Sequence, residues 1–209
     1  MRHPIVACVV FCFLIAGCSQ QPPPPVAAED EAAFAEWQSV VPTQMNETQQ
    51  AQHELCVAAV NAMMSETMGE MEAAMESGNA ADAIAVCREK APAIAASVSD
   101  QFGLKIGRTS LKLRNPANAP PEWADGLVAS EAADPVFLAG PNGEFAALLP
   151  IKLKAGCQMC HGPTEMIDDE VLSAISKHYP NDHAVGYAEG DLRGWIWAEA
   201  PAGEPETVL

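Results

Sequence analysis

Apolar residues recur every three or four positions along residues 48–77, which is the spacing of one face of an α-helix. That face carries Val57, Val60, Met64, Met68, Met71 and Met75. Residues 77–79 interrupt the pattern, and a second helix is predicted from Asn79, a plausible N-cap, to near Gly103. Because the turn between them is short and contains glycine, we expect an antiparallel helical hairpin. Pro92 should kink the second helix.

Beyond Gly103 the pattern changes from a helical period to a period of two. Residues 110–114 alternate polar and apolar side chains, which predicts a half-buried strand. Residues 135–139 and 144–154 predict two more strands joined by a turn, and residues 168–178 predict a short helix. Residues 193–199 predict a last strand, with Trp195 and Trp197 on one face. Helices followed by antiparallel strands indicate an α+β fold.

The N-terminus has the pattern of an export signal. Arg2 and His3 precede an apolar run over residues 5–16, which is followed by Gly17-Cys18. This ending resembles a bacterial lipobox, so residues 1–17 are predicted to be a lipoprotein signal peptide and Cys18 the lipid attachment site. An ordinary cleavage site is the alternative. Residues 18–30 are proline-rich and predict a tether, and residues 31–209 a single domain. We expect the protein on the periplasmic side of a bacterial membrane, held by its lipid alone.

The formal net charge of −17 argues against nucleic acid or an anionic membrane surface as a direct partner. A basic protein remains possible. The length leaves no room for an attached kinase or cyclase domain. We therefore expect a separate redox or signalling protein as partner, which the sequence does not name.

Residues 157–161 read Cys-Gln-Met-Cys-His, the motif for covalent attachment of haem c. Cys157 and Cys160 would each bond one vinyl group, and His161 would ligate the iron. A disulfide-exchange site or half of a zinc site would also use two such cysteines. The zinc hypothesis lacks a second Cys pair or closely spaced His pair downstream. We predict one covalent haem c.

Of the seven cysteines, Cys8 and Cys12 would leave with the signal peptide, Cys18 would carry the lipid, and Cys157 and Cys160 would be bonded to haem. Two cysteines remain. In the expected hairpin, Cys56 and Cys87 would lie roughly 18 Å apart at 1.5 Å rise per residue. A disulfide needs Cα atoms within about 7 Å. Cys56 is therefore predicted to be a buried, inert thiol, and Cys87 is free for another role.

Several segments between residues 83 and 199 resemble one known family. They are Ala85-Val86-Cys87 with Ala91-Pro92, Arg108, Arg114-Asn115-Pro116-Ala117-Asn118, Trp123, the residues 157–162, Tyr179-Pro180-Asn181-Asp182, Gly186-Tyr187 and Gly190-Asp191-Leu192-Arg193-Gly194. The family comprises exported haem c domains with a PAS-like fold, long catalogued as a domain of unknown function and represented by a cyanobacterial cytochrome with Cys/His ligation. One departure is Ala124, where an acidic residue is expected, although Asp125 follows.

The resemblance implies a PAS-like antiparallel sheet enclosing one haem c, with His161 and Cys87 as the two axial ligands. From the residues alone, Cys87 is as readily a small buried hydrophobe. Met64 and Met71 are the next candidate ligands, although a methionine stripe at helical spacing is usually core. His53, His178 and His183 are rivals that more commonly lie on a surface.

Four of the eleven basic side chains fall within ten residues: Lys105, Arg108, Lys112 and Arg114. They form either one solvated strand face or a site for haem propionates, for which arginine offers a bidentate fork. Arg108 is the first candidate and Arg114 the second.

Three functions fit these residues. The resemblance favours a haem module that senses redox state or a ligand. The alternative is an electron carrier that keeps both axial ligands in both oxidation states. An enzyme such as a peroxidase would need an open iron position and a distal acid-base group, and none is evident near Cys87, so we expect no catalytic activity.

Overall fold

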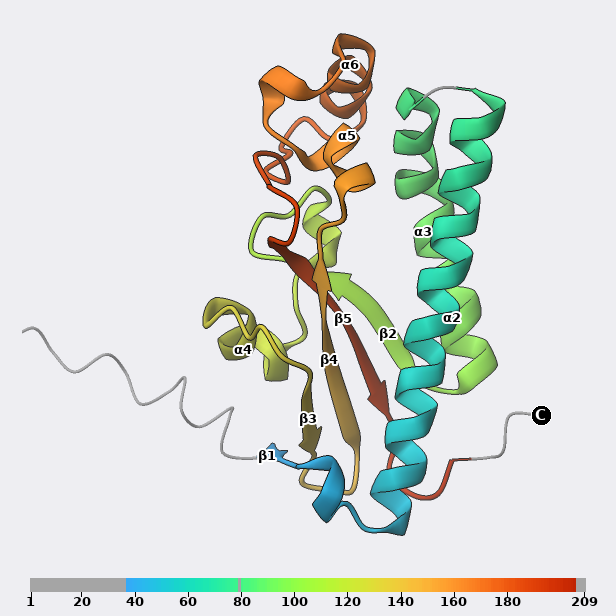
Figure 1. Cartoon of the computed structure of the whole chain (residues 1–209). Coiled ribbons are helices and arrows are strands. Elements are labelled where there is room, and N and C mark those ends of the chain that lie inside the picture. Colours follow the sequence, from blue (N-terminus) through green and yellow to red (C-terminus); the bar gives the residue numbers. More distant parts are fainter. Residues whose placement is uncertain (1–36, 79, 206–209) are drawn as a thin grey trace, which may run out of the picture.

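The structure is a computed structural model that describes residues 37–78 and 80–205. The predicted signal peptide, Cys18 and the tether lie outside the described residues. The elements in chain order are β1 (Gln38–Ser39), η1 (Pro42–Gln44), α2 (Glu47–Ser77), α3 (Ala80–Phe102), β2 (Lys105–Thr109), η2 (Pro116–Asn118), η3 (Glu122–Ala124), α4 (Asp125–Ala129), β3 (Val136–Ala139), β4 (Phe145–Lys152), η4 (Ala155–Cys157), α5 (Gln158–His161), η5 (Thr164–Met166), α6 (Asp169–His178) and β5 (Leu192–Ala200) (Figure 1).

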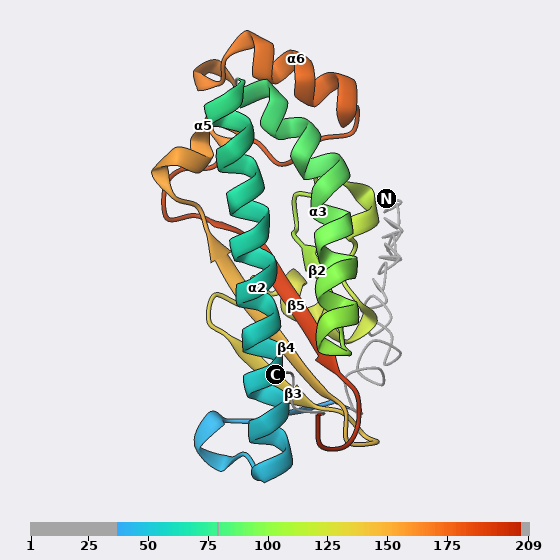
Figure 2. The ribbon, with the colours of Figure 1, turned by 90° about the vertical axis from the view of Figure 1, so that its right-hand side faces the viewer.

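The predicted helical hairpin is confirmed, and its two helices run side by side in opposite directions (Figure 2). A reciprocal capping box starts α2: the Asn46 side chain accepts from the Gln49 amide at 2.8 Å, and the Gln49 side chain accepts from the Asn46 amide at 3.0 Å. Pro92 lies inside α3, which changes direction along its length in Figure 2. Proline explains such a bend, because its nitrogen has no proton to give to the preceding turn.

The first long strand is not where the sequence pattern predicts it. Gly103, with φ of 63°, ends α3, and β2 begins two residues later at Lys105. The prediction of a strand over residues 110–114 is wrong, because this segment bends and its side chains reverse the expected burial. Leu111 is 53% exposed, whereas Arg114 is buried against Asp182. The path of the chain here is set by the pairing of Arg114 with Asp182, which the local sequence pattern does not indicate.

The strands form one five-stranded antiparallel sheet in the order β1-β3-β4-β5-β2. The strands predicted over residues 135–139, 144–154 and 193–199 are confirmed to within about two residues at each end. β4 and β5 are the longest strands and lie next to each other near the middle of the sheet, with Phe145 opposite Ala200 and Leu149 opposite Ile196. The α+β prediction is therefore confirmed.

Each face of the sheet packs on a different part of the chain (Figure 1). Phe145, Ala147, Ile196 and Ala198 face the hairpin and pack with Cys56, Val60, Met63 and Val98. On the other face, Trp195 packs with Trp123 and Val128 beside α4. Trp197 packs against the same cluster as Trp195, as the period of two predicts. The sheet is thus covered by the hairpin on one side and by the segment containing α4 on the other.

The two cysteines of the hairpin lie in different environments, as predicted. Cys56 is fully buried between α2 and the sheet, and burial raises the pKa of its thiol to about 12. Cys87 is half-buried on α3, and both thiols are free. The inert role predicted for Cys56 agrees with a thiol that does not ionise at neutral pH.

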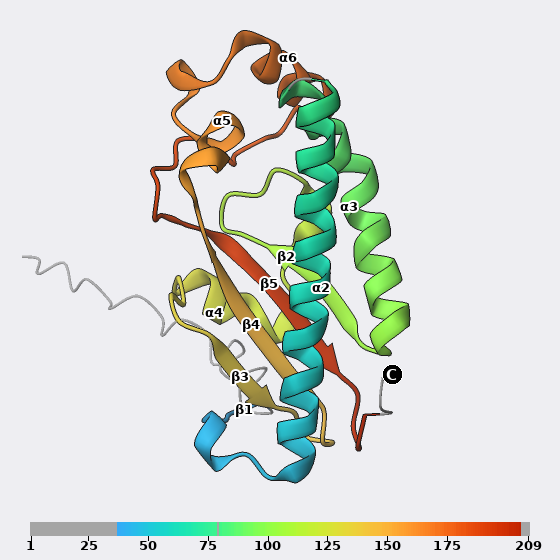
Figure 3. The same cartoon turned by 45° about the vertical axis from the view of Figure 1, so that its right-hand side comes forward.

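A small cap of helices and loops lies beyond the end of the sheet, around α5 and α6 (Figure 3). α6 lies against α3, where Val171 and Ile175 pack with Ile84 and Tyr179. The cap thereby fixes the segment after β4, which contains Cys157, relative to the helix that carries Cys87. Within the described residues, every helix is too short or too polar to cross a bilayer.

Candidate cofactor site

A cavity of about 420 Å³ lies between the helical hairpin and the sheet, next to the cap. This volume is within the range of small-molecule and cofactor sites. The hairpin lines it with Met63, Met64, Thr67, Met68, Met71, Met75 and Cys87. The opposite side is lined by Arg108, Thr109, Arg114, Cys157, Cys160, His161, Tyr179 and Arg193. The structure thus gathers the motif at residues 157–161, Cys87 and both predicted arginines around one space.

The Cys-x-x-Cys-His segment is a tight helical turn. Cys157 ends η4 and Cys160 lies in α5, so the two thiols are three residues apart and fall on the same side of the turn. The Gly162 amide closes the turn on the Gln158 carbonyl at 2.9 Å. A Cβ at Gly162 would come within 2.7 Å of that carbonyl oxygen, so a side chain there would disturb the turn.

The imidazole of His161 is held in one tautomer. Its Nδ1 lies 2.7 Å from the Ala184 carbonyl oxygen, a distance that requires a proton on Nδ1, because two lone pairs would repel. The Nε of Arg193, 3.3 Å from the same Nδ1, is therefore a neighbour and not a donor to it. Burial, with the positive charges of Arg193 and Arg114, lowers the pKa of His161 to about 3. The ring is neutral, and Nε2 keeps the lone pair that a metal requires.

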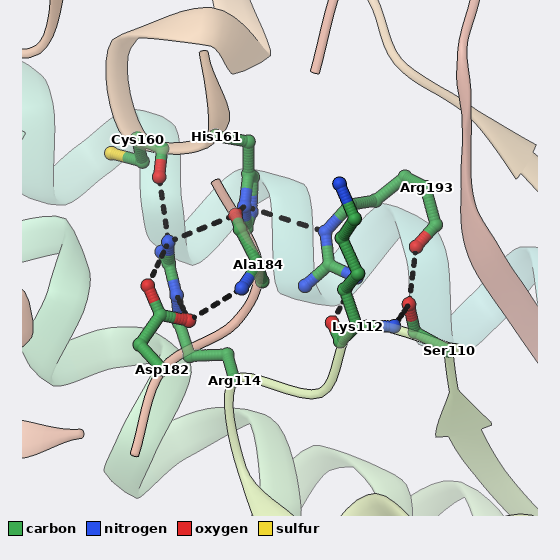
Figure 4. Close-up of polar contacts among 8 residues, drawn as sticks. All are labelled: Ser110, Lys112, Arg114, Cys160, His161, Asp182, Ala184 and Arg193. Carbon is green, nitrogen blue, oxygen red and sulfur yellow. Dashed lines mark hydrogen bonds and ion pairs between the residues drawn. The ribbon is translucent and has the colours of Figure 1, made fainter. Parts of the chain in front are cut away.

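A buried ion pair connects the motif to the loop that contains Ala184, the hydrogen-bond acceptor of His161 (Figure 4). The Nε and Nη2 of Arg114 lie 3.0 and 3.2 Å from the two carboxylate oxygens of Asp182, and the side chains are 7% and 8% exposed. The same Nη2 donates to the Cys160 carbonyl at 2.6 Å, and Asp182 accepts from the Ala184 amide at 2.9 Å. One pair of side chains thus fixes both the motif and the acceptor of His161.

Main-chain hydrogen bonds complete this support. The Tyr187 amide donates to the His161 carbonyl at 3.0 Å, and the Gly186 amide donates to the Gly162 carbonyl at 2.8 Å. The loop 184–187 therefore pairs with the end of the motif almost as an adjacent strand would. These hydrogen bonds set the position and the ring orientation of His161.

Cys87 faces the same cavity from α3. Its Sγ lies 3.9 Å from the Sδ of Met71 on the neighbouring helix. Burial raises the pKa of Cys160, and a negative charge on Cys87 would raise it further, as would one on Cys157. Burial likewise raises the pKa of Tyr179 to about 12, with Cys87 contributing, so the phenol beside Cys87 stays protonated. Cys87 is thus near both the motif and Tyr179.

The candidate arginines differ in how far they are already engaged. The guanidinium of Arg114 donates hydrogen bonds to Asp182 and to the Cys160 and Ala184 carbonyls. Arg108 lines the cavity from β2, on the same face as the core residue Ile106. Both predicted arginines therefore lie at the site, but Arg114 is engaged in supporting the motif.

Sequence analysis missed Arg193 as a site residue. It is at the start of β5, with its guanidinium 5.5 Å from the centre of the Tyr187 ring and its Nε beside His161. Burial lowers its pKa, and among the described residues no carboxylate lies within ion-pair distance of it. The signal that could have indicated it is the segment Gly190-Asp191-Leu192-Arg193-Gly194, which carries the family resemblance and contains Arg193.

The rival histidines lie elsewhere. His53 packs edge-on against Phe137, at 4.6 Å between ring centres. His178 contacts Arg88 at 2.7 Å, and His183 is exposed. None of the three lines the cavity, whereas Met64 and Met71 do. Within residues 37–78 and 80–205, no three His, Cys, Asp or Glu side chains are grouped to hold a metal ion.

The lining suits a flat cofactor with a polar edge. Two thiols and a neutral imidazole face a side rich in thioethers, and arginines lie near them. The Oγ1 atoms of Thr67 and Thr109 are buried without a hydrogen-bond partner, and both residues line the cavity. Buried hydroxyls normally have partners, so a polar group within the cavity would satisfy them. This donor set fits haem c, whose propionates are polar and whose vinyl groups accept thiols.

Comparisons with known proteins identify a matching family model and a similar fold. The Tll0287-like family model matches residues 32–201, a range that extends well before Ala83, where the resemblance in sequence begins. The chain is also similar to a solved structure, the cyanobacterial haem protein Tll0287, with a TM-score of 0.54 and 23% identity. The match covers 72% of this chain and 94% of that one. No curated protein matches the sequence.

Replacing Asp182 by Asn should destabilise the protein, because Arg114 would keep its buried charge without a carboxylate. We expect a loss of about 3 kcal/mol in the free energy of unfolding. The matched control is Glu70→Gln, which removes the carboxylate of an exposed pair with Lys90 and should cost less than about 1 kcal/mol. Urea denaturation followed by circular dichroism measures both. Equal stability of the two variants would show that the buried pair does not support the motif.

Proposed function

This chain belongs to the Tll0287-like family, and we propose that it is an exported, lipid-anchored monohaem c protein that senses redox state or a ligand. The observation that carries the proposal is the neutral, oriented His161 beside Cys157 and Cys160, in a cavity that Cys87 faces from the hairpin. The similar structure is that of a haem protein, which agrees with the donor set.

Each residue of the motif has a separate task. Cys157 and Cys160 would add their thiols to the two vinyl groups, which would attach the cofactor covalently. His161 would offer Nε2 to the iron, while Nδ1 keeps its proton and donates it in a hydrogen bond to the Ala184 carbonyl. Arg108 and Arg193 supply positive charge for the propionates, and Thr67 and Thr109 supply hydroxyl groups. The bound group supplies an iron centre that changes by one electron.

A sensor is favoured over a carrier because the two axial ligands are held unequally. His161 is next to a thioether and is fixed by hydrogen bonds to its ring and its carbonyl. Cys87 has no such attachment and is presented by α3, whose interior contains Pro92. A thiolate stabilises ferric iron and binds ferrous iron less well, so reduction would loosen the contact between α3 and the cofactor. The hairpin would then have two positions relative to the sheet.

An electron carrier is the alternative function. It would need Cys87 to remain a ligand in both oxidation states. We propose no catalytic activity: the residues that line the cavity include no histidine besides His161 to act as a distal acid or base.

The proposed location follows from the N-terminal sequence. Residues 1–17 act as a lipoprotein signal peptide, Cys18 carries the lipid, and the proline-rich residues 18–30 form a tether for a domain over residues 31–209. Attachment of haem c takes place outside the cytoplasm, which agrees with the periplasmic side of a bacterial membrane. The partner is a redox or signalling protein; with a net charge of −17, nucleic acid is an unsuitable partner.

Denaturing electrophoresis with haem staining tests covalent attachment. The wild-type band should stain, because thioether bonds survive denaturation, and the double variant Cys157→Ala, Cys160→Ala should not. His161→Ala is the control, since it removes an iron ligand but leaves both thiols. An unstained wild-type band, or a stained double variant, would refute haem c.

The role of Cys87 is tested by the spectra of the Cys87→Ala variant. The wild-type ferric protein should be six-coordinate and low-spin with a thiolate ligand, and the ferrous protein should bind carbon monoxide in place of Cys87. Cys87→Ala should keep its covalent haem but lose the thiolate signature. Cys56→Ala is the matched control, because Cys56 is in the same hairpin but in the core. Wild-type ferrous iron that keeps both ligands and excludes carbon monoxide would favour the electron carrier.

Membrane association is tested by fractionating cells that express Cys18→Ser. The wild type should be recovered with the membranes, and the variant should be either released or left unprocessed, because its hydroxyl cannot receive the lipid. A Cys18→Ser protein that is processed normally and stays on the membrane would contradict lipid anchoring.

A further inference from the structure

The hairpin presents a row of thioethers to the cavity. Met64, Met68, Met71 and Met75 recur at three- and four-residue steps along α2, and all four line the cavity. Their neighbour Met63 also lines the cavity, but it is 1% exposed and packs in the core between α2 and the sheet. The row therefore faces the cofactor space, where its sulfur atoms are potential metal ligands as well as apolar surface.

Met71 is distinguished from the rest of the row by its contact with Cys87. Its Sδ lies 3.9 Å from the Cys87 Sγ, across the interface between α2 and α3. Met75 is one turn further along α2, a displacement of roughly 6 Å at 1.5 Å rise per residue. Methionine has three rotatable side-chain bonds, so Met71 can move its sulfur by a few ångströms without moving the helix. Any position vacated by the Cys87 sulfur is within its reach.

The other ligand types around the cavity are less suited to that position. His53, His178 and His183 lie outside the lining. Lys152 and Lys154 line the cavity, but both are exposed, and a hydrated ammonium has no lone pair to offer. A neutral thioether next to the thiol is therefore the best placed replacement.

We propose that Met71 is a second axial ligand, which takes the place of Cys87 when the bound iron is reduced. This inference rests on the proposed function, since it assumes a haem with Cys87 as its ferric ligand. An anionic thiolate suits ferric iron, whereas a neutral thioether suits ferrous iron, as in cytochromes with a Met/His pair. Reduction by one electron would therefore transfer the iron's second axial bond from α3 to α2.

The exchange balances as follows. One electron from an external one-electron reductant converts ferric to ferrous iron. The bond between iron and the Cys87 sulfur breaks, its electron pair stays on that sulfur, and the sulfur takes one proton from water. The new bond forms from a lone pair of the Met71 sulfur, so no proton is released. α3 loses its bond to the iron, and α2 gains one.

The test compares Met71→Leu with the control Met75→Leu in the purified holoprotein, reduced with dithionite. Both variants should match the wild-type ferric spectrum, because Cys87 is unchanged. Ferrous wild type and Met75→Leu should be low-spin and six-coordinate, and ferrous Met71→Leu should be high-spin and five-coordinate. If Met71 is bound in about nine of ten ferrous molecules, removing it should tighten carbon monoxide binding about tenfold. Identical ferrous spectra and affinities in all three proteins would overturn the exchange.

A second comparison does not depend on reduction. In Cys87→Ala, ferric iron should recruit Met71 and remain low-spin, with the magnetic circular dichroism of a thioether ligand. The double variant Cys87→Ala, Met71→Leu should become high-spin, and a low-spin double variant would contradict the assignment. If wild type fails haem staining or lacks a ferric thiolate, the proposed function itself fails. If those results hold and only the Met71 comparisons fail, the exchange alone is refuted.

Discussion

The buried pair of Arg114 and Asp182 is the interaction on which the arrangement of the site depends. Moving two charges out of water is costly, and their attraction offsets the cost only when the remaining donors and acceptors are also satisfied. Here the Cys160 and Ala184 carbonyls and the Ala184 amide provide those partners. The pair therefore joins three segments far apart in the chain: the exit from β2, the motif after β4 and the loop before β5.

This support produces an asymmetry between the two sides of the cavity. On one side, His161 is fixed in position, tautomer and orientation by Ala184, Tyr187 and the Arg114 pair. On the other, Cys87 and Met71 belong to α3 and α2. The buried contacts of α3 with the cap are apolar, and the polar contacts of these helices, Lys90 with Glu70 and Arg88 with His178, are exposed. Directional hydrogen bonds define a single geometry, whereas apolar contacts tolerate small shifts. The rigid side suits a permanent ligand, and the adjustable side suits a ligand that responds to the state of the iron.

The sheet is the part of the structure relative to which α2 and α3 would move. Away from the cap, Phe145 and Ile196 of the sheet pack with Val98 of α3, and Cys56 of α2 is buried in the same core. Towards the cap, the same two helices face the cavity instead of the sheet core. A change of ligand at the cavity would move the hairpin end near Met71 and Cys87, while the packed core holds the opposite end in place. Close-packed cores resist deformation, so motion would be concentrated at the cavity.

The sequence by itself determined the elements whose signals are local. The helical period of residues 48–77 and the alternation around Trp195 and Trp197 both act within a few residues, and the structure contains the corresponding elements. The motif of Cys157, Cys160 and His161 is likewise recognisable from five consecutive residues. Only the tertiary structure decided the path of residues 110–114, because Arg114 is buried by Asp182, a partner 68 residues away. The same holds for Arg193 and for the contact of Met71 with Cys87. These depend on which segments meet in space, and a period along the chain carries no information about that.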